Sequence, residues 1–185
     1  QIENVWDIFK LNDQAIREDI ELIKDTKTFV TPSETNQILG EEVFIEEGAK
    51  VECVILNSTT GPIYIAKDAE VMEGSMLRGP IALCENGVIK MGAKIYGATT
   101  IGPYSKVGGE VNNCVIQGYS NKGHDGFLGN SVIGEWCNLG ADSNNSNLKN
   151  NYQSVDVYNY VEEKYVDTEL QFCGLIMGDH SKSAI

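Results

Sequence analysis

The feature that most constrains the fold is an aliphatic residue recurring at every sixth position between residues 65 and 107. All eight positions of this phase carry an aliphatic side chain: Ile65, Val71, Leu77, Leu83, Ile89, Ile95, Ile101 and Val107. A second phase, four residues later, holds mostly small residues: Ala69, Ser75, Gly87, Ala93, Thr99 and Ser105, with Ile81 and Val111 as larger exceptions. A period of six fits neither an amphipathic helix nor an alternating strand. It is typical of a short parallel strand and a turn repeated along a coil.

Three such units would complete one triangular turn of the coil. The aliphatic residue of each unit would point to the axis, and the small residue would let the chain turn the corner without a clash. A single turn cannot bury its apolar face alone, so successive turns must stack as parallel ladders. We therefore predict an all-β fold, a parallel β-helix.

The first 36 residues do not follow this repeat. Between residues 3 and 25, Ile16, Ile20 and Ile23 are spaced as on one face of an amphipathic helix, which we expect to break near Asn12. Its apolar face would cover the end or flank of the coil, or the helix would be a hinge to an upstream segment. Residues 25–36 have no periodicity and indicate a linker. We thus predict a helical connector and linker over 1–36 and a β-helix domain over 37–185.

The repeat of this domain is irregular near its start and in its middle. Leu39, Ile45 and Val51 are expected to begin the first turn. Fourteen residues rather than twelve then separate Val51 from Ile65, which predicts a two-residue insertion within 57–62. The pattern fails between 113 and 127, and breaks in a stiff scaffold are places where functional groups are displayed.

The second half of the domain contains a long departure from the coil. Ile133 and Leu139 restore the period in a shifted phase, after which residues 142–170 form a polar loop that we expect to contain a hairpin. Residues 174–181 look like a return to the coil. The sequence ends within another repeat unit, so we expect the parent protein to continue beyond it.

Composition excludes several functional classes. Asp and Glu number 27 against 14 Lys and Arg, and the net charge of −13 disfavours binding to nucleic acid or to an anionic membrane surface. The five cysteines contain no C-x-x-C pair, so we expect buried, reduced side chains and no metal site. Neither a membrane-spanning apolar run nor a signal peptide is recognisable, which favours a cytoplasmic protein.

The densest group of polar residues lies at 121–129 and 138–149. His124 and Asp142 are 18 residues apart, one regular turn, so their neighbourhoods are expected to stack. A histidine surrounded by Asn, Lys and Asp suits deprotonation of a neutral amine or hydroxyl. Asp125, the next residue, is a candidate to orient the imidazole ring.

The residues from His124 onward resemble a known family. They follow the pattern H-x-x-[aromatic]-[aliphatic]-G-x-S-x-[aliphatic]-G-x-x-x-N-[aliphatic]-G-A and continue to S-N-L-K. This pattern is similar to the acetyltransferase domain of the bifunctional glucosamine-1-phosphate acetyltransferases/N-acetylglucosamine-1-phosphate uridylyltransferases. The likeness is specific over about 110–150 and weaker through the repeats, and the family's N-terminal nucleotidyltransferase domain is absent here. The resemblance implies a left-handed hexapeptide-repeat β-helix, a homotrimer with sites between adjacent coils, and acetyl-CoA as co-substrate.

The resemblance also assigns roles to individual residues. His124 is expected to be the general base that takes a proton from the sugar amine during direct transfer to that amine. The substrate-binding residues implied are Asn138, Asn147 and Phe127 at the acceptor sugar and Lys122 and Lys149 at its phosphate. The residues implied for coenzyme A are Ala141 and Lys182.

Two departures from the family pattern fall at the acceptor end. Phe127 stands where the family usually has Tyr, and Gly140-Ala141-Asp142-Ser143 replaces G-A-G-T, so a carboxylate is introduced. These changes leave the acceptor sugar open. Because later turns supply much of the coenzyme A cleft in the family, we expect little activity from residues 1–185 alone.

Two other functions compete with this interpretation. The β-helix would instead be a non-catalytic trimerisation and regulatory module of a sugar-1-phosphate nucleotidyltransferase, with the Asn-rich segment as scaffold. It would alternatively acylate a different amino sugar or an alcohol. Trp136 stands at an unspecified position of the pattern, and we expect it to pack at a corner or subunit contact. His180 belongs to no motif, and we expect it to be a surface corner residue.

Overall fold

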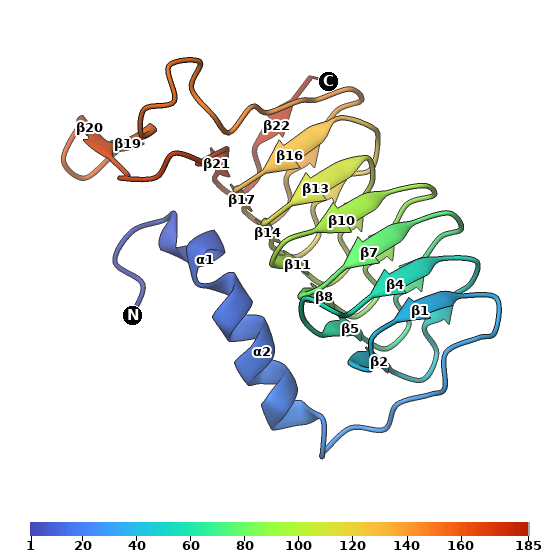
Figure 1. The fold of residues 1–185 in the computed structure, drawn as a ribbon. Coiled ribbons are helices and arrows are strands. Elements are labelled where there is room, and N and C mark those ends of the chain that lie inside the picture. The colour runs from blue at the N-terminus through green and yellow to red at the C-terminus, as the bar shows by residue number, and fades with distance from the viewer. Residues whose placement is uncertain (185) are drawn as a thin grey trace.

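The computed structural model describes residues 1–184, which form a parallel β-helix flanked by two N-terminal helices and a protruding hairpin (Figure 1). Three parallel sheets make the three faces of the coil, with six, seven and seven strands. The predicted all-β parallel β-helix of hexapeptide repeats with an N-terminal helix is confirmed. The left-handed sense of winding stays the implication of the family resemblance.

Each sheet takes every third strand along the coil. The first sheet contains β1 (Gln37–Leu39), β4 (Ile55–Asn57), β7 (Met76–Arg78), β10 (Lys94–Tyr96), β13 (Glu110–Asn112) and β16 (Phe127–Gly129). The second contains β2 (Val43–Ile45), β5 (Ile63–Ile65), β8 (Ile81–Leu83), β11 (Thr99–Ile101), β14 (Val115–Ile116), β17 (Val132–Ile133) and β21 (Ile176–Met177). The third contains β3 (Lys50–Val51), β6 (Glu70–Val71), β9 (Val88–Ile89), β12 (Lys106–Val107), β15 (Asn121–Lys122), β18 (Asn138–Leu139) and β22 (Lys182–Ser183).

The six-residue pattern identified the side chains that fill the coil. All eight aliphatic residues of the main phase point inward and are at most 2% exposed. The small residues of the second phase, such as Ala69, Ser75 and Ser105, are also buried, where the chain turns between sheets. The aliphatic residues, with Ala69 and Ala93 of the second phase, belong to the main hydrophobic core of the protein. Burial of these repeating columns holds the short strands in register, because each strand alone has too few hydrogen bonds to be stable.

The number of residues per turn changes along the coil. Ile63 pairs with Ile81 and Ile81 with Thr99, a repeat of 18, whereas Thr100 pairs with Val115, a repeat of 15. In the first complete turn Val43 pairs with Ile63, a repeat of 20, which confirms the two-residue insertion predicted near 57–62.

Two predictions about the repeat are wrong. The first inward residue of the first sheet is Ile38 and not Leu39, because Ile38 pairs with the buried Leu56. Ile38 and Leu39 are both exposed, since no earlier turn covers them. The winding does not stop at 113–127, since β14, β15 and β16 continue all three sheets. The six-residue phase was lost there because a corner is shorter, so the sequence pattern shifts while the coil persists.

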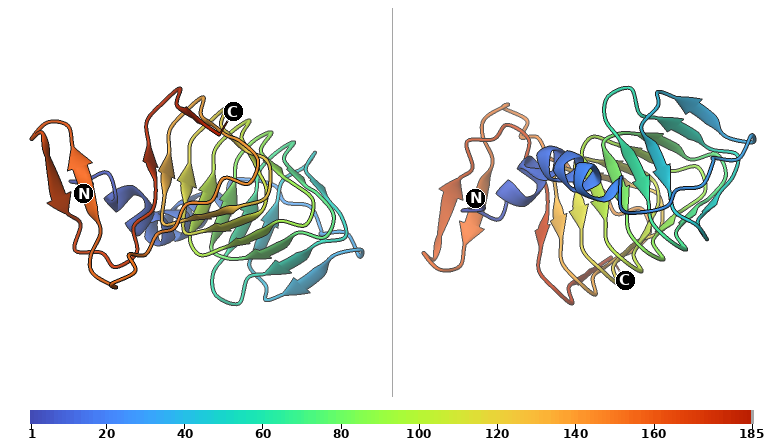
Figure 2. Two further views of the ribbon diagram at one scale, coloured as in Figure 1. Left: turned by 90° about the horizontal axis from the view of Figure 1, so that it is seen from above. Right: turned by 90° about the horizontal axis from the view of Figure 1, so that it is seen from below.

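The N-terminal segment forms two helices that lie along the second sheet (Figures 1 and 2). The helices are α1 (Asp7–Lys10) and α2 (Asn12–Ile23), so the predicted break near Asn12 is observed. Ile16 and Ile20 are buried against outward side chains of the sheet, among them Tyr64. Asn12 extends this contact, because its Nδ2 donates to the Ala98 carbonyl over 2.7 Å. The helix therefore covers the flank of the coil.

After β18 the chain still pairs with the first sheet through a parallel bridge between Leu128 and Asn145, and it then leaves the coil to form an arm that runs to the start of β21 (Figure 2). Its antiparallel hairpin joins β19 (Asp156–Asn159) to β20 (Lys164–Asp167), as the sequence predicted. The hairpin packs on Trp6 and Phe9 of the N-terminal segment in a second, smaller hydrophobic core. The chain then returns to the coil, where β21 pairs with β17 and β22 with β18.

The cysteines are free thiols, and three of the five fit the predicted role of buried filler, namely Cys114, Cys137 and Cys173. Cys84 is half-buried, and Cys53 is exposed at a corner, so for Cys53 the prediction of burial is wrong. None of the helices described is long and apolar enough to cross a membrane.

Candidate functional site

A hollow of about 400 Å³ lies on the outer surface of the third sheet, near the last turns of the coil. It brings together three of the residues predicted from the sequence: His124, Asn138 and Ala141. The rest of its lining comes from the same face of neighbouring turns, namely Lys90, Lys106, Asn121, Gly123, Leu139, Gly140 and Ala184. We call this hollow the third-sheet pocket.

Register explains why these residues meet. Asn121 pairs with Asn138, a repeat of 17 in this part of the coil, so position 141 follows position 124 by one turn. Ala141 and His124 therefore come from equivalent places in successive turns. The predicted stacking of the two neighbourhoods is confirmed, with a repeat of 17 rather than 18.

His124 lies at the corner between the third and first sheets. Between β12 and β13 this corner contains only Gly108 and Gly109, but between β15 and β16 it contains the four residues 123–126. The wider corner stands beside a narrower one, so it projects from the coil and leaves His124 exposed. Gly123 forms part of the pocket surface, and a Cβ atom added to it would have no atom within 4 Å.

The pocket differs in charge from the rest of the protein. Its lining includes Lys90 and Lys106 and contains no Asp or Glu, although the chain as a whole carries a net charge of −13. Two ammonium groups beside a histidine make a local positive potential that favours anionic groups such as phosphates.

Lys122 does not lie in the pocket. Its side chain occupies the inward position of β15 and is 2% exposed, and its Nζ donates to the carbonyl oxygens of Gly108 and His124, each over 2.9 Å. Burial lowers the pKa of this ammonium. The expected contact with a substrate phosphate is therefore wrong for Lys122, because its charged end is used inside the coil.

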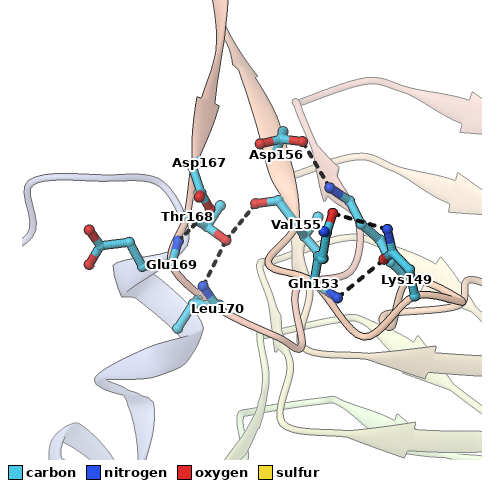
Figure 3. A network of polar contacts seen from close by, with 9 residues as sticks. Lys149, Gln153, Val155, Asp156, Asp167, Thr168, Glu169 and Leu170 are labelled. Atoms are coloured by element: carbon cyan, nitrogen blue, oxygen red, sulfur yellow. Dashed lines mark hydrogen bonds and ion pairs between the residues drawn. The ribbon is translucent and has the colours of Figure 1, made fainter.

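Lys149 is at the base of the arm, where Figure 3 shows its ammonium beside Asp156. The distance from Nζ to Asp156 Oδ2 is 2.8 Å. Asn147 lies nearby and donates from Nδ2 to Asn130 Oδ1 over 2.6 Å. Neither residue lines the third-sheet pocket. Within one chain, the structure thus separates Asn147 and Lys149 from His124.

Phe127 lies on the first sheet, on the far side of the corner from the pocket, and its ring is half-buried. Lys182 is closer to the predicted site, since it is exposed on β22 and pairs in register with Asn138. Among the described residues no hydrogen bond joins Asp125 to His124, so the proposed orienting contact is not formed.

The two departures from the family pattern have different structural contexts. Asp142 has a φ of 54°, a left-handed conformation that glycine adopts freely and aspartate tolerates better than most residues. Its replacement of the family's glycine is therefore compatible with the corner, and it leaves the carboxylate exposed. Phe127 lies outside the third-sheet pocket, so its missing hydroxyl removes nothing from that surface.

Sequence reasoning missed Lys90 and Lys106, which belong to the regular part of the coil. Both precede residues 113–127, where the six-residue pattern fails. The sequence does contain a signal for Lys106. It comes directly before the inward residue Val107, just as Asn121 comes directly before the inward residue Lys122. Residues at this outward position pair from turn to turn, so they form one column on the outer face of the third sheet. Residues of adjacent turns share that column whether or not the pattern is regular.

Outside the pocket, the residues set aside as structural are placed as expected. Trp136 and His180 are exposed at successive corners between the second and third sheets. The Trp136 ring stacks on Tyr119, with ring centroids 4.5 Å apart, and Tyr119 stacks on Tyr104. Trp136 thus packs at a corner, as predicted.

The repeat and the three parallel sheets define a hexapeptide-repeat β-helix domain. The chain is 26% identical to a protein named bifunctional protein GlmU from Alkaliphilus metalliredigens, over 76% of this chain and 36% of that protein. No family model matches the chain. The chain therefore has the fold of a hexapeptide-repeat domain and is similar in sequence to part of bifunctional protein GlmU. The chain spans about a third of the length of this relative.

Proposed function

We propose that the third-sheet pocket is the site of an acetyl-CoA-dependent N-acetyltransferase that acts on an amino-sugar 1-phosphate of the glucosamine 1-phosphate type. The observation that carries the proposal is the meeting of His124, Asn138 and Ala141 in one pocket, built from two successive turns. The similarity to bifunctional protein GlmU supports the same class of reaction. The product would be an N-acetylated sugar phosphate used in the synthesis of a sugar nucleotide such as UDP-N-acetylglucosamine.

In the proposed reaction the exposed imidazole of His124 acts as general base. The sugar amine attacks the thioester carbonyl of acetyl-CoA, the new N–C bond forms, and the C–S bond breaks. The imidazole takes one proton from the amine and returns it to the departing thiolate, so the products are an amide and the coenzyme A thiol. No covalent intermediate on the protein is required.

The remaining residues of the pocket would bind the two substrates. Asn138 offers both a donor and acceptors to the sugar hydroxyls. We assign the sugar phosphate to Lys90 and Lys106, in place of Lys122 and Lys149, because their side chains line the pocket. Coenzyme A would extend past Ala141 toward Lys182 along the third sheet.

We further propose that the protein works as a homotrimer of parallel coils, with the pocket facing a neighbouring coil. A triangular prism presents flat faces that suit side-by-side packing about a threefold axis. Asn147 and Phe127, which lie away from His124 within one chain, would reach the acceptor only from a neighbouring subunit. Their assignment to the acceptor therefore depends on the trimer.

The test is a thiol-release assay with acetyl-CoA and glucosamine 1-phosphate, carried out on the full-length protein. We expect His124→Ala to lower kcat by about 10²- to 10⁴-fold, the usual contribution of a general base. His180→Ala is the matched control, because it removes the other histidine of the chain, which lies outside the pocket. Equal turnover in wild type and His124→Ala would contradict the proposal.

A panel of acceptors tests the specificity of the same site. Turnover with glucosamine 1-phosphate but not with glucosamine would support phosphate binding, and Lys106→Gln should then raise KM for the phosphorylated sugar. Turnover only with a different amino sugar or an alcohol would favour another acyltransferase reaction.

The competing function is that of a non-catalytic trimerisation or regulatory module. It is favoured by an apolar hollow of about 340 Å³ on the first sheet, lined by Ile55, Met76 and Tyr96 among others. Met76 is 44% exposed there, as expected of a surface that a partner covers. A full-length protein that releases no thiol with any acceptor, yet loses its oligomeric state on Met76→Lys, would establish this alternative.

A further inference from the structure

Lys122 occupies a position where the turns on either side of it have aliphatic side chains. It pairs in register with Val107 of the turn before, in the inward column of the third sheet that also includes Val71, Ile89 and Leu139. A leucine or isoleucine would fill this position without a buried charge. An ammonium group removed from water destabilises a fold unless it is well hydrogen-bonded. This lysine therefore requires an explanation beyond packing.

The partners of Lys122 are backbone carbonyls and not a carboxylate. Its Nζ donates to Gly108 O and to His124 O, each over 2.9 Å, and among the described residues it takes part in no ion pair. Gly108 belongs to the turn before and His124 to the turn of Lys122 itself. The side chain thus joins two adjacent turns from inside the coil.

The corner beside Lys122 shows why such a link is needed. In the four-residue corner at 90–93 the amide of Ala93 donates to the Lys90 carbonyl over 3.2 Å, which closes the turn. The equivalent carbonyl one turn later is that of Gly108, since Val107 pairs with Ile89. Its corner contains only Gly108 and Gly109 before β13 begins, so it is too short for the same bond. The Gly108 carbonyl accepts from Lys122 Nζ instead.

The corner that contains His124 is too long, and not too short, to match its neighbour. It is two residues longer than the corner beneath it, so part of its backbone has no peptide of the preceding turn to pair with. The His124 carbonyl is nevertheless satisfied, because the second hydrogen bond of Lys122 reaches it from the inside. The Lys122 ammonium thus satisfies one carbonyl in the two-residue corner and one in the four-residue corner, which differ in length and cannot pair fully with each other.

We propose that Lys122 is a positioning residue that fastens the widened corner to the turn beneath it and so fixes the backbone from which His124 presents its imidazole to the pocket. This inference rests on the proposed function for its catalytic consequence, but the structural link stands by itself. A lysine suits the task because it has a long apolar stem, which fills the coil, and three N–H donors at its tip.

The test compares Lys122→Met with wild type. Methionine has a similar length and no donor, so it should fill the space and leave both carbonyls unpaired. We expect the amide of Glu110, which donates to Gly126 O at the far end of the corner, to exchange with solvent at least tenfold faster. We also expect kcat for acetyl transfer to fall at least tenfold while KM for acetyl-CoA changes less than twofold.

Three comparisons make this result specific. Ile89→Met is the matched control, since Ile89 is fully buried in the same inward column two turns earlier. It should change neither the Glu110 exchange rate nor kcat. The amide of Ile81, bonded to Pro62 O, is the internal reference for the remote coil. If Lys122→Met does not fold by circular dichroism, Lys122→Gln replaces it, because a glutamine keeps N–H donors while lacking the reach.

Unchanged exchange at Glu110 in a folded Lys122→Met variant would overturn the proposed link. Faster exchange with an unchanged kcat would overturn the positioning role. These kinetic measurements use the full-length protein, and if its wild type shows no turnover, the proposed function fails separately. The exchange rate of the Glu110 amide would then still test the link, and the NMR line width of the His124 ring would decide the positioning role. A broader ring line in Lys122→Met than in wild type would support that role, and an unchanged line would contradict it.

Discussion

The coil and the segments attached to it are stabilised in different ways. Inside the coil, columns of aliphatic residues such as Leu83 and Ile95 are fully buried, and each strand pairs with the turns on both sides. The arm has one antiparallel strand pair and one isolated antiparallel bridge, between Leu148 and Phe172, and it packs through a small core shared with Trp6 and Phe9. The tip of the hairpin is open to solvent, with Tyr160 86% exposed.

This difference teaches where rigidity and adaptability reside in the molecule. A two-stranded hairpin is marginal by itself, so the arm depends on the N-terminal segment for its order. The coil depends on its own repeats and forms a stiff base for the third-sheet pocket. We therefore expect changes in the coil to destabilise the whole protein and changes in the shared core to loosen only the arm.

The largest effect is expected from Leu83→Ala in the middle of the coil. Leu83 is fully buried, and a cavity there should lower the free energy of unfolding by about 4 kcal/mol, within the range for buried leucines. Urea denaturation followed by circular dichroism measures this change. Leu22→Ala is the matched control, because Leu22 is 73% exposed on α2 and its loss should change stability by less than about 0.5 kcal/mol. Equal effects would break the comparison.

A smaller and local effect is expected from Trp6→Ala. Trp6 is 8% exposed and packs in the core shared with the arm, so we expect a loss of about 3 kcal/mol in the stability of that core. Hydrogen exchange should accelerate at the amides of 156–167 and stay unchanged in β8 and β11. Trp136→Ala removes the other tryptophan, which is exposed at a corner, and should leave the arm unaffected. Faster exchange throughout the coil would show that coil and arm unfold together.

The attachment of the N-terminal segment to the first turn gives the third prediction. Glu46 is buried and accepts hydrogen bonds from Lys27 Nζ, the Tyr64 hydroxyl and the Lys67 amide. Burial alone raises the pKa of Glu46, but the hydrogen bonds from Lys27 and Tyr64 outweigh burial, so the pKa is lowered overall. Glu46→Gln should therefore lower stability at pH 7 by about 2 kcal/mol, as for other hydrogen bonds to charged groups.

The pH dependence of this contact follows from the direction of the shift. A carboxyl group with a lowered pKa in the folded state stabilises the fold fully above its unfolded pKa, and this stabilisation is lost as the pH falls through the folded pKa. The difference in stability between wild type and Glu46→Gln should thus shrink on acidification from pH 7 to pH 3. Glu47→Gln, at an exposed neighbouring position, is the control. A difference that stays constant with pH would contradict the assigned ion pair.

The sequence was sufficient to predict the coil, because inward residues such as Ile65 and Ile101 repeat at a period of six, which fits neither an amphipathic helix nor an alternating strand. It also placed His124 and Asn138 near each other, since the pairing of adjacent turns depends only on the repeat length. The hairpin was predicted for a similar reason, from alternating residues such as Val155 and Val157.

The sequence failed where corner length matters. The family resemblance implies a phosphate contact for Lys122, and only the three-dimensional corner shows which carbonyls its ammonium satisfies. The two-residue corner at Gly108 and Gly109 shifted the period, which gave the appearance of a break in the coil. Lys149 was assigned to the substrate from its place in the pattern, but its partner Asp156 lies in a hairpin whose packing depends on Trp6, far away in the sequence.

The most direct test of the proposed site is an NMR titration of the full-length protein with coenzyme A. We predict that chemical shift changes concentrate at His124, Asn138 and Ala141 on the third sheet, while the amides of the arm and of the first sheet keep their positions. Changes confined to the arm or to the hollow around Met76, or no change at saturating coenzyme A, would contradict the claim that the third-sheet pocket is the site of acetyl transfer.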